Sequence, residues 1–129
     1  MNDKRQTLID YRLQKSLDTL DEAEILIFNQ MYSGAVNRLY YACFYSVLAL
    51  LMDIELYSKT HKGVIKLFNE NFIKTTKISK EYGLFYNQLF NSRMENDYSD
   101  FVEIESEVVI DWLNKSKDFI NTIIELIKS

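Results

Sequence analysis

The residues best suited to chemistry lie in one short segment, 93–98, which reads Arg-Met-Glu-Asn-Asp-Tyr. An arginine side chain is a planar fork of N–H donors that can hold a phosphate through two parallel hydrogen bonds. A tyrosine can donate a hydrogen bond to a phosphate or stack on a base. The segment is therefore a candidate phosphate or RNA site, in which Arg93, Asn96 and Asp97 bind and Arg93 and Tyr98 form the catalytic pair.

His61 and Lys62 are the other candidates for phosphate binding. His61 is the only histidine of the chain, and both residues open a predicted helix, whose free N–H groups favour an anion. His61 could also act as a base in RNA cleavage if the fold brings it near Arg93. Both residues could instead have purely structural roles. His61 would then be hydrogen-bonded to a nearby carboxylate, and Arg93 would form an ion pair with Asp97 at the end of a helix.

The composition favours long helices that position these residues. The chain has 129 residues, 47% of them hydrophobic and 26% charged, with no proline and three glycines. So few turn residues argue against a β-rich fold and predict a single all-α domain over residues 1–129. The lone Cys43 excludes an internal disulfide, and its apolar neighbours predict a buried residue.

Apolar residues recur at steps of three and four positions, which predicts a bundle of four to five helices. The second predicted helix is apolar on most of its circumference, except at Asn37 and Arg38. Ser58 or Thr60 is expected to cap the third, and residues 96–101 are expected to be irregular. The expected ranges of the first, second, fourth and fifth helices are about 7–29, 33–53, 79–94 and 102–127.

Charge is distributed unevenly. The formal net charge of −4 argues against a protein that coats nucleic acid, yet residues 59–80 hold six lysines and one acid. Residues 94–111 hold seven acids and no base, which suggests complementary surfaces. Glu103, Glu105 and Glu107 make a poor metal site because residues two apart do not share a helix face, so we expect no metal.

No membrane segment is expected. The N-terminal residues lack the apolar core of a signal peptide, and the apolar run 40–52 is shorter than the roughly 20 residues that span a bilayer. We therefore expect a cytoplasmic protein.

Three stretches together resemble the HEPN (higher eukaryotes and prokaryotes nucleotide-binding) domain family. They are residues 35–42 in the apolar helix, residues 59–64 at the start of the next, and residues 93–98 before Asp100-Phe101. The resemblance is closest to small, stand-alone prokaryotic members and covers nearly the whole chain. It implies a helical homodimer in which two copies of the arginine motif face one cleft, without a cofactor.

The resemblance also implies a function. Many HEPN proteins are metal-independent endoribonucleases whose motif is Arg, four to six residues, then His, and others pair with a nucleotidyltransferase in toxin–antitoxin modules. Arg93 matches the family arginine, whereas Tyr98 stands where the histidine would be. Since tyrosine has a pKa of about 10, it is a poor base at neutral pH. In some related modules the partner enzyme modifies a tyrosine near the motif, which makes Tyr98 the candidate here.

We therefore expect a nucleotide- or RNA-binding HEPN-like protein that acts with a nucleotidyltransferase-like partner in a toxin–antitoxin or defence setting. The second hypothesis is an endoribonuclease that uses Arg93 and Tyr98, and the third is a non-catalytic module that docks proteins. Asn37, Arg38 and Tyr41 are expected to support the site. Arg38 in particular could pair with an acid in residues 95–100 and so hold that segment against the second helix.

Overall fold

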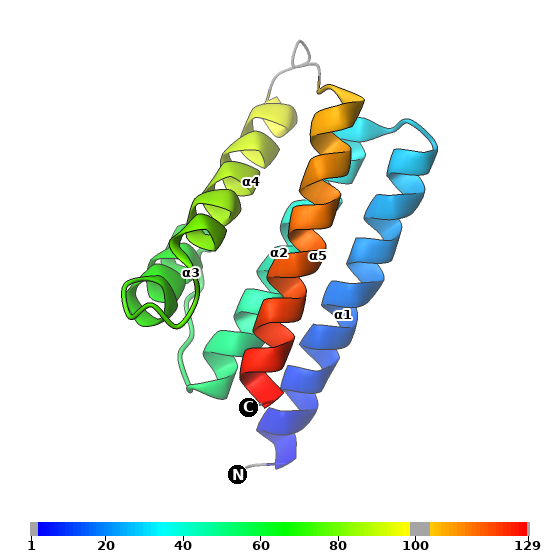
Figure 1. The fold of residues 1–129 in the computed structure, drawn as a ribbon. Helices are drawn as coiled ribbons and strands as arrows, with labels where there is room; N and C mark the ends of the chain where they lie inside the picture. The colour runs from blue at the N-terminus through cyan, green and yellow to red at the C-terminus, as the bar shows by residue number, and fades with distance from the viewer. Residues whose placement is uncertain (1–2, 99–103, 129) are drawn as a thin grey trace.

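The computed structural model describes the backbone of residues 3–98 and 104–128, and the side chains of residues 3–93 and 104–128. Within these ranges the chain forms helices and no strands, which confirms the all-α prediction. The elements are α1 (Asp3–Phe28), α2 (Tyr32–Asp53), α3 (His61–Phe68), the π-helical turn η1 (Asn69–Ile73), α4 (Lys80–Tyr98) and α5 (Ser106–Lys128). In Figure 1, α1, α2, α4 and α5 run roughly side by side, and the short α3 lies at the edge beside α4.

Helix α2 is the centre of the bundle, because it packs against α1, α3, α4 and α5. Small residues let the helices approach closely: Ala42 and Cys43 are fully buried, and the Ser16 hydroxyl of α1 donates to the Ala42 carbonyl at 2.6 Å. Burial raises the pKa of the Cys43 thiol to about 12, so it stays protonated and unreactive. The predicted buried role of Cys43 is confirmed.

Three helix boundaries differ from the prediction. Helix α1 begins at Asp3, whose carboxylate suits the positive end of the helix dipole. Helix α4 continues to Tyr98, so the backbone of residues 96–98 is helical rather than irregular, whereas 99–101 lie outside the described residues. No glycine or proline interrupts residues 94–98, and without such a residue nothing local stops the helix. Helix α5 begins four residues later than expected, at Ser106.

The apolar run 40–52 lies within a helix that is long and apolar enough to cross a membrane. That helix, Tyr32–Asp53, has 22 residues, so its length does not support our prediction against a membrane span. Its packing does, because 61% of the most apolar window is buried inside the bundle. This is the burial expected of a core helix that neighbouring helices surround.

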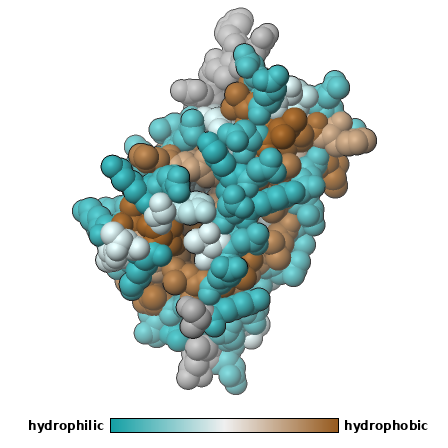
Figure 2. Space-filling view, in the orientation of Figure 1, coloured by the Kyte–Doolittle hydropathy of each residue, from teal (hydrophilic) through white to brown (hydrophobic). Residues whose placement is uncertain are grey.

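Apolar side chains are also exposed at one end of the bundle. Ile25, Phe28 and Met31, around the turn between α1 and α2, are 61%, 88% and 58% exposed. Hydrophobic colour gathers in this region at the upper right of Figure 2, whereas hydrophilic residues cover much of the same face. Exposed apolar groups that lie together are typical of a contact surface.

Candidate phosphate-binding site

Arg93 of α4 lies against two consecutive tyrosines of α2. Its guanidinium carbon stands 5.3 Å from the ring centre of Tyr40 and 5.5 Å from that of Tyr41. Its Nη1 also donates to the Tyr41 hydroxyl at 3.3 Å. Aromatic faces attract a cation, so the two rings hold the guanidinium in place at a half-buried position. A guanidinium held in this way loses less freedom when it binds an anion.

His61 is brought to the same place by the start of α3. Thr60 caps this helix, as predicted, with its hydroxyl accepting from the Gly63 N–H at 2.9 Å. A Cβ at Gly63 would overlap the hydroxyl of Ser58 and lie 2.8 Å from that of Thr60, so a larger residue would require both side chains to shift and would disturb the cap. The His61 ring then stacks on Phe44 with ring centres 4.4 Å apart, and its Nδ1 lies 2.6 Å from the Tyr40 hydroxyl.

His61 and Arg93 therefore meet at Tyr40, which contacts both. Burial lowers the pKa of His61 below its ordinary 6.5, and the positive charge of Arg93 lowers it further. Burial raises the pKa of Tyr40 far above its ordinary value of 10, so the phenol keeps its proton at neutral pH. Such a phenol can donate a hydrogen bond to Nδ1 of His61. The His61 tautomer that carries its proton on Nε2 then offers an N–H donor to an anion. This arrangement suits phosphate binding better than proton abstraction.

The coupling of the two residues can be measured directly, because His61 is the only histidine. We expect Arg93→Ala to raise the pKa of His61 toward 6.5, since the change removes a repelling positive charge. Arg93→Lys should preserve most of the depression because it keeps the charge. The imidazole resonances, followed by NMR from pH 4 to 8, report the pKa. An unchanged pKa in Arg93→Ala would show that the two groups are not coupled.

The same pKa shift predicts how stability depends on pH. The folded pKa of His61 lies below the unfolded value of about 6.5, so the unfolded chain binds more protons between the two values. The contribution of His61 is therefore complete above pH 6.5 and is lost as the pH falls through the folded pKa. We measure the free energy of unfolding with urea at several pH values. As the pH falls through this window, it should decrease less in His61→Gln than in the wild type.

Tyr41 links Arg93 to the other predicted supporting residues. The Arg38 guanidinium carbon lies 5.2 Å from the centre of the Tyr41 ring, and its Nη2 donates to the Asn37 side chain at 2.9 Å. The described acid beside Arg38 is Glu22 of α1, at 3.7 Å. The expected partners in residues 95–100, like the side chains of the predicted Asn96, Asp97 and Tyr98, lie outside the described residues.

Comparison with known proteins identifies the family. Residues 9–127 match the HEPN domain, which is nearly the whole chain. The chain belongs to the HEPN domain family. This HEPN protein is 43% identical to a UPF0332 protein of Thermotoga maritima, over 99% of this chain and 96% of that one.

Two further relatives come from Methanocaldococcus jannaschii. The first, named "Putative toxin MJ0142", is 37% identical over 84% of this HEPN chain and 74% of its own length. The second, named "Putative toxin MJ0605", is 34% identical over 77% of this chain and 81% of its own.

The candidate site contains aromatic residues that the sequence did not predict as part of it. Tyr40 begins the apolar run 40–52 and was not among the predicted site residues, yet it touches both His61 and Arg93. Phe44 and Phe90 add ring contacts to His61, with centres 4.4 and 6.4 Å away. The available signal was the tyrosine pair at positions 40–41, which follows Asn37-Arg38 after one leucine and is itself followed by Phe44-Tyr45.

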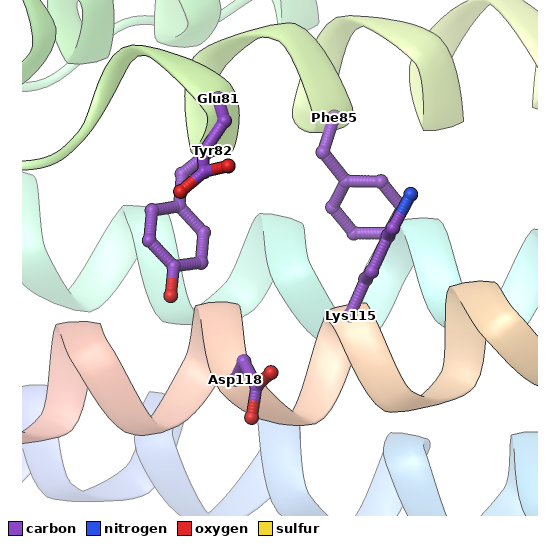
Figure 3. A pocket seen from close by; sticks show the side chains of 5 residues that line it. All are labelled: Glu81, Tyr82, Phe85, Lys115 and Asp118. Carbon is purple, nitrogen blue, oxygen red and sulfur yellow. The ribbon is translucent and has the colours of Figure 1, made fainter.

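A separate pocket between α4 and α5 has different chemistry. It has a volume of about 210 Å³ and mixes two carboxylates with one lysine and two aromatic rings (Figure 3). Its lining residues are Glu81, Tyr82, Phe85, Lys115 and Asp118. Lys115 also pairs with Asp111 at 3.2 Å. Since none of the predicted site residues lines this pocket, it is not the candidate site of the HEPN domain.

Proposed function

We propose that this HEPN protein binds RNA or a nucleotide by holding a phosphate at Arg93. The observation that carries the proposal is the convergence of Arg93 from α4 and His61 from α3 on Tyr40 of α2. Arg93 supplies the charge, and the neutral His61 supplies an N–H donor beside it. Residues far apart in the sequence thus present two donors at one half-buried place.

Local charge supports an anionic ligand even though the whole chain is acidic. Lys59 and Lys62 flank the start of α3, Lys66 lies in its last turn, and all three are exposed. Their side chains can steer a polyanion toward His61, because charges clustered on one face raise the local concentration of counter-ions. The net charge of −4 of the whole chain limits unspecific binding to nucleic acid.

The proposal extends to the setting in which the protein acts. Two relatives carry the word toxin in their names, so we propose that this chain belongs to a toxin–antitoxin or defence module in the cytoplasm, with a nucleotidyltransferase-like partner.

We also propose a homodimer in which two copies of Arg93 share one cleft. The half-buried rings of Tyr41, Phe44 and Tyr45 support this, since they leave apolar surface beside the site.

The decisive test is the affinity of Arg93→Ala for RNA. Loss of a charged hydrogen-bond partner costs about 1.5–3 kcal/mol, so affinity for a short single-stranded RNA should fall roughly 10- to 100-fold. Arg12→Ala on α1 is the matched control, because it removes the same charge from another helix and should change affinity less than threefold. Fluorescence anisotropy at fixed salt measures both, with circular dichroism as the check on folding.

Two results would contradict the proposal. Equal affinity in the wild type and Arg93→Ala would mean that Arg93 does not hold the phosphate. Unchanged His61 imidazole resonances on addition of RNA would mean that the ligand binds elsewhere. Since His61 is the only histidine, its resonances report on this site alone.

A second candidate function is metal-independent cleavage of RNA. The contact of His61 with the tyrosine that also holds Arg93 favours it, because a histidine near a phosphate could transfer a proton. The lowered pKa of His61 and its bond to Tyr40 favour binding instead. Cleavage in EDTA that disappears in Arg93→Ala would support the nuclease.

A further inference from the structure

A groove of about 590 Å³ runs between the α3–η1 segment and α4, and we call it the α3–α4 groove. It opens beside the candidate site and is separate from the pocket between α4 and α5. Its lining combines apolar, amide and basic side chains. These residues are Lys62, Ile65, Lys66, Asn69, Glu70, Lys74, Asn87, Phe90 and Asn91.

Each kind of side chain in the α3–α4 groove has a counterpart in a polynucleotide. The aromatic ring of Phe90 is only half buried, so it leaves apolar surface on which a base can stack. The three asparagines carry amides that can both donate to and accept from base edges. The three lysines are exposed and suit phosphates, whereas the single acid, Glu70, lies 4.0 Å from Lys66.

The groove joins the candidate phosphate site through a shared wall. The Phe90 ring lies 6.4 Å from the His61 ring and 5.7 Å from the Tyr40 ring, so it faces both the groove and the site. Arg93 follows Phe90 by one helical turn, and Lys62 directly follows His61. A chain whose phosphate lies at Arg93 would therefore continue into the groove.

Local backbone features bring the two walls together. The π-helical turn η1 continues α3 and begins at Asn69, one of the lining residues. Opposite it, Gly83 lets α4 approach closely, since a Cβ there would lie only 3.1 Å from Ile73 and 3.2 Å from Asn69. A larger residue at position 83 would require the side chains of Ile73 and Asn69 to shift.

We propose that the α3–α4 groove binds the nucleotides of a single-stranded RNA that flank the phosphate at Arg93. The inference rests on the proposed function and adds its substrate class. Unpaired bases can reach Phe90 and the asparagines, whereas the bases of a duplex are already stacked and paired. A purely acidic peptide would match the lysines but has no ring to stack on Phe90.

The test compares two charge-reversed variants against a 10-nucleotide single-stranded RNA. Lys66→Glu/Lys74→Glu changes the groove, and Lys77→Glu/Lys80→Glu makes the same change in charge at exposed lysines outside it. We expect affinity to fall at least tenfold in the groove variant and less than threefold in the control. For the wild-type protein, an abasic RNA of the same length should bind about fivefold more weakly or worse, because base stacking is lost.

The possible outcomes separate the inference from the proposed function. If Arg93→Ala weakens RNA binding and the groove variant does not, phosphate binding at Arg93 stands and the groove inference is wrong. The groove inference would also be wrong if both charge-reversed variants lost RNA affinity equally. The same holds if the wild type bound abasic RNA as tightly as normal RNA. A deca-glutamate peptide that binds as tightly as RNA would identify a docking surface for protein. No binding of RNA by the wild type would overturn both proposals.

Discussion

Replacing Tyr40 by alanine should reduce the free energy of unfolding by about 3–5 kcal/mol, the cost of removing a large buried aromatic side chain. The Tyr40 ring is fully buried and lies 5.2–6.0 Å, centre to centre, from the rings of Tyr41, Phe44, Tyr86 and Phe90. Alanine would leave a cavity where α2, α3 and α4 meet. Urea unfolding followed by circular dichroism measures the loss.

Tyr40→Phe separates the ring from its hydroxyl. Phenylalanine keeps the ring contacts but loses the 2.6 Å hydrogen bond to Nδ1 of His61, so the expected loss is only about 1 kcal/mol. The NMR titration of His61 should change while the fold remains. If Tyr40→Phe destabilised the protein as much as Tyr40→Ala, the hydroxyl rather than the packing of the ring would dominate the contribution of Tyr40.

The fold could be predicted because helices are encoded locally. The apolar spacing along α2 and α5 and the absence of proline indicate helices without knowledge of their neighbours. Thr60 was also predictable as a cap, since the capping bond joins residues only three apart. The start of α1, the end of α4 and the start of α5 differ from the prediction, because no glycine or proline lies near them to mark a boundary.

The candidate site could be predicted only in part, because its contacts are long-range. Arg93 and His61 were selected from their chemistry and from resemblance, but their meeting at Tyr40 depends on how α2, α3 and α4 pack. The Arg93–Tyr41 bond spans 52 positions, and the Tyr40–His61 bond spans 21. No local pattern encodes such pairs. Arg38 shows the same limit, since its ion pair with Glu22 joins two different helices.

The largest change in activity is expected from Tyr98→His. This substitution restores the spacing of arginine, four residues and histidine that HEPN ribonucleases share, on an α4 backbone that is helical through position 98. A histidine with a pKa of about 6.5 can exchange protons at neutral pH, and a positioned general acid or base contributes about 10²–10⁴-fold in rate. We therefore expect the wild type to leave a single-stranded RNA intact in EDTA, and Tyr98→His to cleave it measurably.

The controls for this experiment separate catalysis from contamination and from binding. Tyr98→Gln also replaces the ring with a polar side chain but cannot exchange a proton near neutral pH, so it should remain inactive. Adding Arg93→Ala to Tyr98→His should abolish the new cleavage, because the phosphate would lose its charged partner. Cleavage by the wild type in EDTA that disappears in Arg93→Ala would instead show that proton transfer does not need a histidine at position 98. His61, which meets Arg93 at Tyr40, would then be the first residue to test as the base.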